Sequence, residues 1–148
     1  MTGLVVDSGD GGTHVHPVCD SYVIASCVKH MPLAGKDITG FIVDSIRARD
    51  RANQISYQDH NEIATKIKEK YGYVCKDVLA EFSKFDKKKK DDNGAWIQSS
   101  KFKRLVHKCV NGSMVPVDVG YEQFLAPEMF FHPVSCPLLL RPSACRNL

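Results

Sequence analysis

The sequence lacks most features that mark membrane proteins, secreted proteins and metalloproteins. It contains no run of about 18 apolar residues, the minimum for a membrane-spanning helix. Its N-terminus has no basic region followed by an apolar stretch, so a secretory signal is not predicted. The six cysteines are scattered and form no C-x-x-C pair, which favours reduced thiols over a disulfide framework. These absences predict an intracellular protein.

Several functional classes are also excluded by what is missing. The net charge is only +3, and no basic cluster is interleaved with aromatic residues, so a nucleic-acid surface is not predicted. The pairs His14 with His16 and His107 with Cys109 do not assemble the four ligands of a structural zinc site. The chain also has no H-E-x-x-H and no nucleophile elbow. With 148 residues, 43% of them hydrophobic, it is long enough to bury a core as one domain.

The most informative segment is a glycine-rich stretch near the N-terminus. The apolar run Leu4–Val6 leads into D-S-G-D-G-G, and apolar and polar residues alternate again from Thr13 to His16. This pattern predicts a strand, a tight glycine turn and a second strand. The lysine of a Walker loop and the spaced glycines of a dinucleotide fold are both missing, so a strand-to-helix phosphate loop is not predicted.

Two interpretations of this turn stay open from the residues alone. Its bare N–H groups could surround a phosphate, with Asp7 and Asp10 at the rim and a hydrated divalent cation between Asp7 and the phosphate. Alternatively, it is an ordinary type I′ hairpin that needs Gly and Asp only for positive φ. A calcium loop is not predicted, because Val18 occupies the position where an EF-hand needs a bidentate Glu.

Helices and further strands follow the hairpin. Residues 19–33 are rich in Val, Ile and Tyr and predict one or two more strands of the same sheet. Apolar spacing predicts a helix from Asp37, with Asp37 as N-cap. A second helix is expected from Asp59, capped by Asp59 and by Glu62 reaching back.

The second half of the chain is less regular. We expect a short amphipathic helix over residues 77–85, a solvated lysine-rich loop over about 86–94, and partial order from Trp96 to Val106. A strand is predicted over 114–119, with a turn or short helix at Pro127. Residues 134–148 contain two prolines and a leucine run without periodicity, and we interpret them as a divergent tail.

Several blocks of the sequence, in order, resemble the actin family. They are Asp7–Gly11 with Thr13 and His14, Leu33–Thr39 and Ile67–Lys70. Residues 22–30 and 118–133, and the long lysine-containing segment between 85 and 117, resemble actin-related proteins more than conventional actin. The resemblance runs from Thr2 to Pro133 and then stops abruptly.

The resemblance implies an α/β fold, namely a fragment of an actin-like ATPase of the ribonuclease H-like type. A β-hairpin and meander in residues 1–35 would be part of an inner subdomain, and residues 36–133 would form a helical outer subdomain. No segment before Thr2 matches the family's first phosphate loop, so we expect the chain to begin inside a two-domain ATPase. The abrupt end of the match favours a truncated or frame-altered product for residues 134–148 over a genuine tail.

The resemblance also implies roles for individual residues. Gly9, Gly11 and Gly12 would donate backbone N–H groups to phosphate, and Asp7 would hold water around a magnesium ion. Asp10 would lie near the ribose, Gly35, Lys68 and Glu69 near the nucleoside, and His14 near the water that attacks the terminal phosphate. Gly12 departs from the family, which usually has a β-branched residue there, and this loosens the start of the second strand.

At the level of function, the resemblance implies an ATP- and Mg²⁺-binding subunit of the actin-related protein 2/3 complex, which nucleates branched actin filaments. Its partners would be actin and the other subunits, in the cytoplasm and cytoskeleton. The full-length protein would have at most weak ATPase activity, and the fragment itself would be inactive. The alternatives are a conventional actin, a sugar kinase or chaperone ATPase that shares the phosphate hairpin, and a non-functional truncated product.

Overall fold

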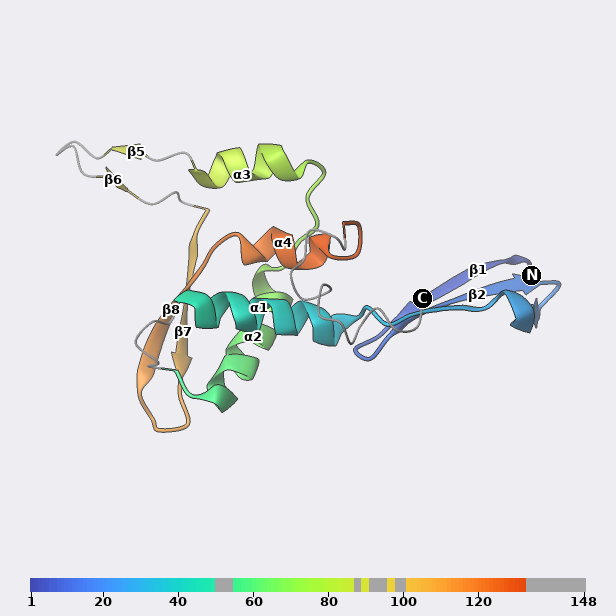
Figure 1. Cartoon of the computed structure of the whole chain (residues 1–148), viewed down its shortest axis with the longest axis horizontal. Helices are drawn as coiled ribbons and strands as arrows, with labels where there is room; N and C mark the ends of the chain where they lie inside the picture. Colours follow the sequence, from blue (N-terminus) through green and yellow to red (C-terminus); the bar gives the residue numbers. More distant parts are fainter. Residues whose placement is uncertain (50–54, 87–88, 91–95, 98–100, 133–148) are drawn as a thin grey trace.

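The computed structural model describes residues 1–49, 55–86, 89–90, 96–97 and 101–132. These residues combine helices with antiparallel sheets, so the predicted mixture of helices and strands is confirmed. Figure 1 shows a narrow sheet extending away from a body made of helices and a second hairpin. Within the described residues, no helix combines the length and the apolar character needed to cross a bilayer.

The predicted glycine hairpin is present at the start of the chain. Strand β1 (Gly3–Ser8) pairs antiparallel with β2 (Thr13–Cys19), and residues 9–12 form the turn. The short strands β3 (Tyr22–Val23) and β4 (Lys29–Met31) also pair with β2, which confirms the expected further strands. A 3-10 turn (Ala25–Cys27) separates them. Strand β2 is therefore the centre of this four-stranded sheet.

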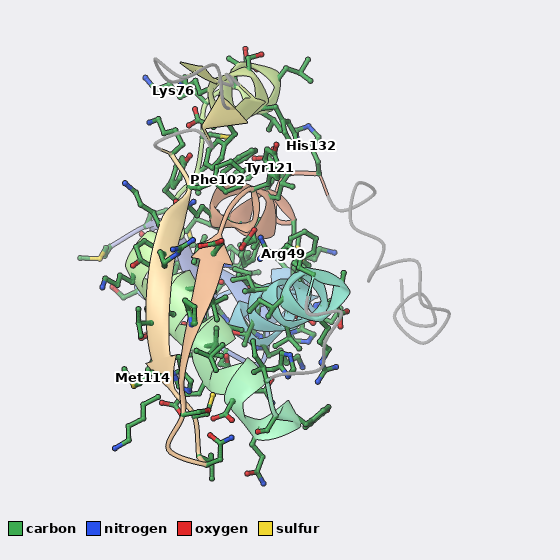
Figure 2. The ribbon with its side chains drawn as sticks, turned by 90° about the vertical axis from the view of Figure 1, so that its left-hand side faces the viewer. Arg49, Lys76, Phe102, Met114, Tyr121 and His132 are labelled. Carbon is green, nitrogen blue, oxygen red and sulfur yellow. The ribbon has the colours of Figure 1, made fainter. Side chains whose placement is uncertain are left out.

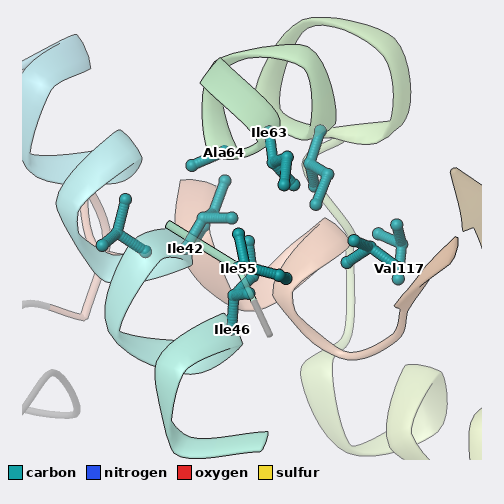
Figure 3. Close-up of a cluster of buried hydrophobic side chains, with 10 residues drawn as sticks. Ile42, Ile46, Ile55, Ile63, Ala64 and Val117 are labelled. Carbon is teal, nitrogen blue, oxygen red and sulfur yellow. The ribbon is translucent and has the colours of Figure 1, made fainter. Parts of the chain in front are cut away.

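A hydrophobic core lies between the helices α1 (Gly35–Arg49) and α2 (Tyr57–Tyr71) and the hairpin of β7 (Lys103–Lys108) and β8 (Met114–Val119). Alternate residues of β8 point inward, as expected for a strand with one buried face. The helix α4 (Glu122–Glu128) closes the core, and Arg49 Nη2 lies 2.5 Å from Glu122 Oε1. Figure 3 shows this cluster, whose buried members are Ile42, Val43, Ile46, Ile55, Ile63, Ala64, Ile67, Val117, Val119 and Ala126.

The first two helices begin earlier than the sequence predicts, and their caps differ. Helix α1 starts at Gly35, and its third residue, Asp37, accepts a hydrogen bond from Ala34 N at 2.9 Å. Helix α2 starts at Tyr57, with Ser56 as N-cap. Asp37 and Asp59 are thus each the third residue of their helix, the position of the acidic residue in a capping box. In sequence, an acid at that position resembles an N-cap. The two predicted N-caps were wrong.

Aromatic residues hold the third helix, α3 (Val78–Asp86), against α4. The Phe85 ring lies 5.3–5.4 Å from the rings of Phe102, Tyr121 and Phe124, and Figure 2 shows Phe102 beside Tyr121. Tyr73 donates a hydrogen bond to the buried Glu81 at 2.8 Å, and burial raises the pKa of this tyrosine. These contacts attach α3 to the core through its apolar face.

The lysine-rich segment is described in part. Lys89–Lys90 form strand β5, which pairs with β6 (Trp96–Ile97). Residues 87–88 and 91–94 of the predicted loop lie outside the described residues, as does the whole predicted tail of residues 134–148.

A buried carboxylate ties the start of α2 to the β7–β8 hairpin. Asp59, only 2% exposed, accepts hydrogen bonds from Ser56 Oγ at 2.8 Å and from Val110 N at 3.1 Å. His107 Nε2 lies 3.4 Å from the same carboxylate, and Lys66 Nζ lies 3.3 Å from His107 Nδ1. Because the ammonium can only donate, Nδ1 accepts and Nε2 carries the proton that faces Asp59.

This network predicts a specific pH dependence of stability. The hydrogen bond from Ser56 contributes most to holding the pKa of Asp59 below its ordinary value, and the contacts with Val110 and His107 add to it. The stabilisation is therefore fully present above about pH 4, where an unfolded Asp is ionised, and is lost as the pH falls through the lower folded pKa. Urea midpoints measured between pH 6 and pH 3 should fall less steeply in Asp59→Asn, whereas the exposed control Asp20→Asn should keep the wild-type slope.

Candidate functional site

The glycine turn of residues 9–12 has a bare backbone. Gly9 N donates to Gly12 O at 3.2 Å across the turn. Among the described residues, positive φ values occur only at Asp20, Ser21 and Gly112. The type I′ geometry therefore lies at residues 20–21, between β2 and β3, and the interpretation of the glycine turn as a type I′ hairpin is wrong.

Packing does not explain Gly9 and Gly11 either. A Cβ atom on Gly11 would meet nothing within 4 Å, and one on Gly9 would meet only Gly12 O at 3.9 Å. The space above the turn is therefore open, and its backbone groups are accessible from outside. The absence of side chains at Gly9 and Gly11, which has neither a conformational nor a packing reason, fits close approach by a ligand.

Hydrogen bonds hold this turn against the start of α1. Gly35 N donates to Gly9 O at 3.1 Å, and Lys36 N donates to Asp10 O at 3.0 Å. The buried Thr13 hydroxyl donates to Leu33 O at 2.8 Å. Gly35 is needed at this junction, because a Cβ there would lie 3.1 Å from Asp10 Oδ1 and 3.4 Å from Gly9 O. The first N–H groups of α1 thus fix the turn and are not free for a ligand.

Helix α2 reaches the same junction through a lysine. Lys68 Nζ donates to Gly35 O at 3.3 Å, so the structure brings Gly9, Asp10, Gly35 and Lys68 together. Glu69 follows Lys68 on α2 and is exposed to solvent. Asp7 and Asp10 are also exposed, at the end of β1 and in the turn. Around the turn, the structure therefore combines bare backbone, the carboxylates of Asp7 and Asp10 and the ammonium of Lys68.

Strand register places a histidine on this surface. Asp7 is the cross-strand partner of His14 in β1 and β2, and His14 is the partner of His30 in β2 and β4. Directly opposite residues of an antiparallel pair point to the same face of the sheet. The structure thus groups Asp7 with His14, and it adds His30, which the sequence reasoning missed because the pairing of β2 with β4 has no local signal.

His30 also accounts for the unusual glycine at position 12. A Cβ on Gly12 would lie 2.7 Å from His30 Cε1, so the imidazole occupies the space that a side chain at residue 12 would fill. The ring of His30 also lies 4.4 Å from that of His14, centroid to centroid. A side chain at position 12 would therefore require the exposed His30 ring to move.

These groups suit a polyphosphate that carries a divalent cation. Open backbone N–H groups can bind phosphate oxygens, whereas two carboxylates beside a phosphate are tolerated when a hydrated cation lies between them. The exposed position of Asp7 leaves room for such water molecules. The residues present therefore fit a nucleotide with its magnesium ion.

The sequence matches known proteins along most of its length. The family profile described as Actin matches residues 1–138. Actin-related protein 3 of Caenorhabditis elegans is 49% identical over 137 residues, which is 92% of this chain and 30% of the relative. Actin-related protein 3C of Homo sapiens is 47% identical over 133 residues, 90% of this chain and 59% of the relative.

Actin-related protein 3 of Drosophila melanogaster is also 47% identical over 133 residues, and the chain covers 29% of it. The chain thus spans between about a third and three fifths of the length of these relatives. The predicted resemblance and the actin-like α/β fold are confirmed by the family match. Because the profile covers residues 1–138 of 148, the chain belongs to the actin family.

Proposed function

We propose that this chain supplies one wall of the ATP site of an actin-related protein. The observation that carries this proposal is the bare glycine turn, which is held by Gly35 and Lys36 and faces open space. In this proposal Gly9, Gly11 and Gly12 line the phosphates, and the N–H groups of Gly11 and Gly12 donate to them, because Gly9 N already donates to Gly12 O. Asp10 lies near the ribose, and Gly35, Lys68 and Glu69 lie near the nucleoside.

Asp7 and His14 have separate roles in the proposed site. The magnesium ion, when bound, supplies positive charge that neutralises the phosphates. Asp7 accepts hydrogen bonds from water molecules around that ion, and its place at the end of β1 holds it beside the turn. His14, its cross-strand partner, orients the water that attacks the terminal phosphate. In this proposal the full-length protein is at most a weak ATPase.

We propose an assembly role for the longer protein of which these residues are part. The relatives named actin-related protein 3 support this proposal. The protein would be a subunit of the actin-related protein 2/3 complex, take part in nucleating branched actin filaments, and act in the cytoplasm and cytoskeleton. Residues 1–35 would contribute to an inner subdomain and residues 36–133 to an outer one. ATP binding would then determine how far the two walls of the nucleotide cleft close, and thereby how the surface of the protein fits the neighbouring subunits.

Membership of the actin family argues against a sugar kinase or a chaperone ATPase. The proteins with which the longer protein assembles distinguish an actin-related protein from a conventional actin.

The role of Asp7 can be tested in a chimera in which residues 1–138 replace the matching segment of the Caenorhabditis elegans relative. Asp7→Asn should weaken ATP binding about tenfold in the presence of Mg²⁺, because an acceptor for the metal's water molecules is lost. Without Mg²⁺ the effect should be small. Asp20→Asn, at the other end of the hairpin, is the matched control. Equal affinities of Asp7→Asn and the unmodified chimera with Mg²⁺ would refute this role.

The 148-residue chain alone should not bind ATP with useful affinity. Its described residues offer one phosphate turn, so the opposite side of the ligand stays in water. Each missing charge-assisted hydrogen bond costs about 1.5–3 kcal/mol, and about 1.4 kcal/mol is a tenfold change in affinity. Three missing bonds weaken binding about a thousandfold or more. Calorimetric titration with Mg-ATP tests this expectation, and saturable micromolar binding would show that the chain completes its own site.

Assembly distinguishes the two actin-type alternatives. The same chimera, expressed with an affinity tag in worm cells, should copurify with a fixed set of partner subunits that includes a second actin-related protein. Mass spectrometry with the tagged parent relative as a positive control gives the reference set. Recovery of the chimera as a homopolymer would instead favour a conventional actin.

A further inference from the structure

Two histidine rings face each other on the sheet. His14 Nδ1 and His30 Nδ1 are 3.3 Å apart, on neighbouring strands β2 and β4. The two residues are directly paired in register, so the strands themselves set this approach. His30 is exposed and His14 is half-buried, which leaves one side of the pair open to solvent.

The separation of the two nitrogens matches that of ligands on one metal ion. With Zn–N bonds of about 2.0–2.1 Å and tetrahedral geometry, two ligand nitrogens lie about 3.3 Å apart. We propose that His14 and His30 bind one transition-metal ion of the kind that prefers imidazole, such as Zn²⁺ or Cu²⁺. Water molecules fill its remaining positions.

The surroundings of the pair favour a cation. Asp7 lies opposite His14 in register and places a carboxylate on the same face of the sheet. Lys29, the neighbour of His30 in β4, alternates to the other face. Without a metal, the contact between the two Nδ1 atoms requires a proton on one of them, which that nitrogen donates to the other. With a metal, both Nδ1 atoms direct a lone pair to the ion. The metal therefore replaces one proton between the rings.

A second histidine site in the described residues makes a useful comparison. Asp59, Glu62 and His107 also place ligand atoms within 4.8 Å of one another. However, Lys66 Nζ already lies 2.6 Å from Glu62 and 3.3 Å from His107, and Ser56 and Val110 donate to Asp59. The Lys66 ammonium thus occupies the position that a metal ion would take there. In the part of the chain that the structure describes, no lysine or arginine forms a hydrogen bond or ion pair with His14 or His30. We therefore assign the metal to the sheet.

This site does not depend on ATP binding. It uses the imidazole of His14 that the proposed nucleotide site also uses, so His14 serves one ligand at a time. A transition metal on the pair would therefore withdraw His14 from the water near a bound nucleotide.

The test is a titration of the untagged 148-residue chain with ZnCl₂, followed by calorimetry. We expect one equivalent to bind saturably, and His30→Ala or His30→Gln to weaken binding about tenfold or more, since a lost ligand costs at least as much as a lost supporting residue. His132→Ala, in the segment after α4, is the matched control and should bind as the parent does. Circular dichroism shows that each variant keeps its fold.

Cu²⁺ gives an independent signature. Electron paramagnetic resonance of the one-to-one complex should show coupling to two imidazole nitrogens, and to one nitrogen in His30→Gln. Unchanged zinc affinity in both His30 variants would overturn the proposal. Loss of binding in Asp59→Asn with retention in His30→Ala would also overturn it, because the metal would then lie at the α2 site.

Discussion

Two backbone hydrogen bonds, from Gly35 N to Gly9 O and from Lys36 N to Asp10 O, fix the glycine turn against the start of α1. The sheet extends away from the helical body, so this junction is where the two parts meet (Figure 1). The bonds serve both parts, because they satisfy helix N–H groups that have no partner within α1. They also set the direction of the turn, which leaves the faces of Gly9 and Gly11 open. The relative positions of Gly9, Asp10, Gly35 and Lys68 follow from this junction.

Local patterns were enough to predict the elements with a strong period. The alternation on both sides of the glycine turn gave the hairpin, and the apolar spacing from Ile38 to Ile46 gave α1. The exact starts of the helices could not be predicted, because an acid at the third position reads like an N-cap. For strand β7 the sequence predicts only partial order. The residues of β7 that point inward can be identified only when its pairing with β8 is known.

The candidate site shows the same limit at longer range. The glycine turn and the acids beside it are contiguous, so sequence reasoning could find them. The contact of Lys68 with Gly35 joins residues 33 positions apart, and only the family resemblance pointed to it. The approach of His30 to His14 needed the register of β2 with β4, which depends on the turns between them. Pairing across a sheet is set by the whole meander and not by any one segment.

The balance of charge explains why the proposed nucleotide site includes a cation. Asp7 and Asp10 place two negative charges beside the turn, and Lys68 supplies one positive charge that is already directed to Gly35 O. A polyphosphate approaching these groups alone meets net repulsion, which the few open N–H groups do not overcome. A divalent cation reverses the sign of the field at Asp7 and makes the same carboxylate an attractive group. In the proposed site the turn, the acid and the metal would therefore act as one functional unit.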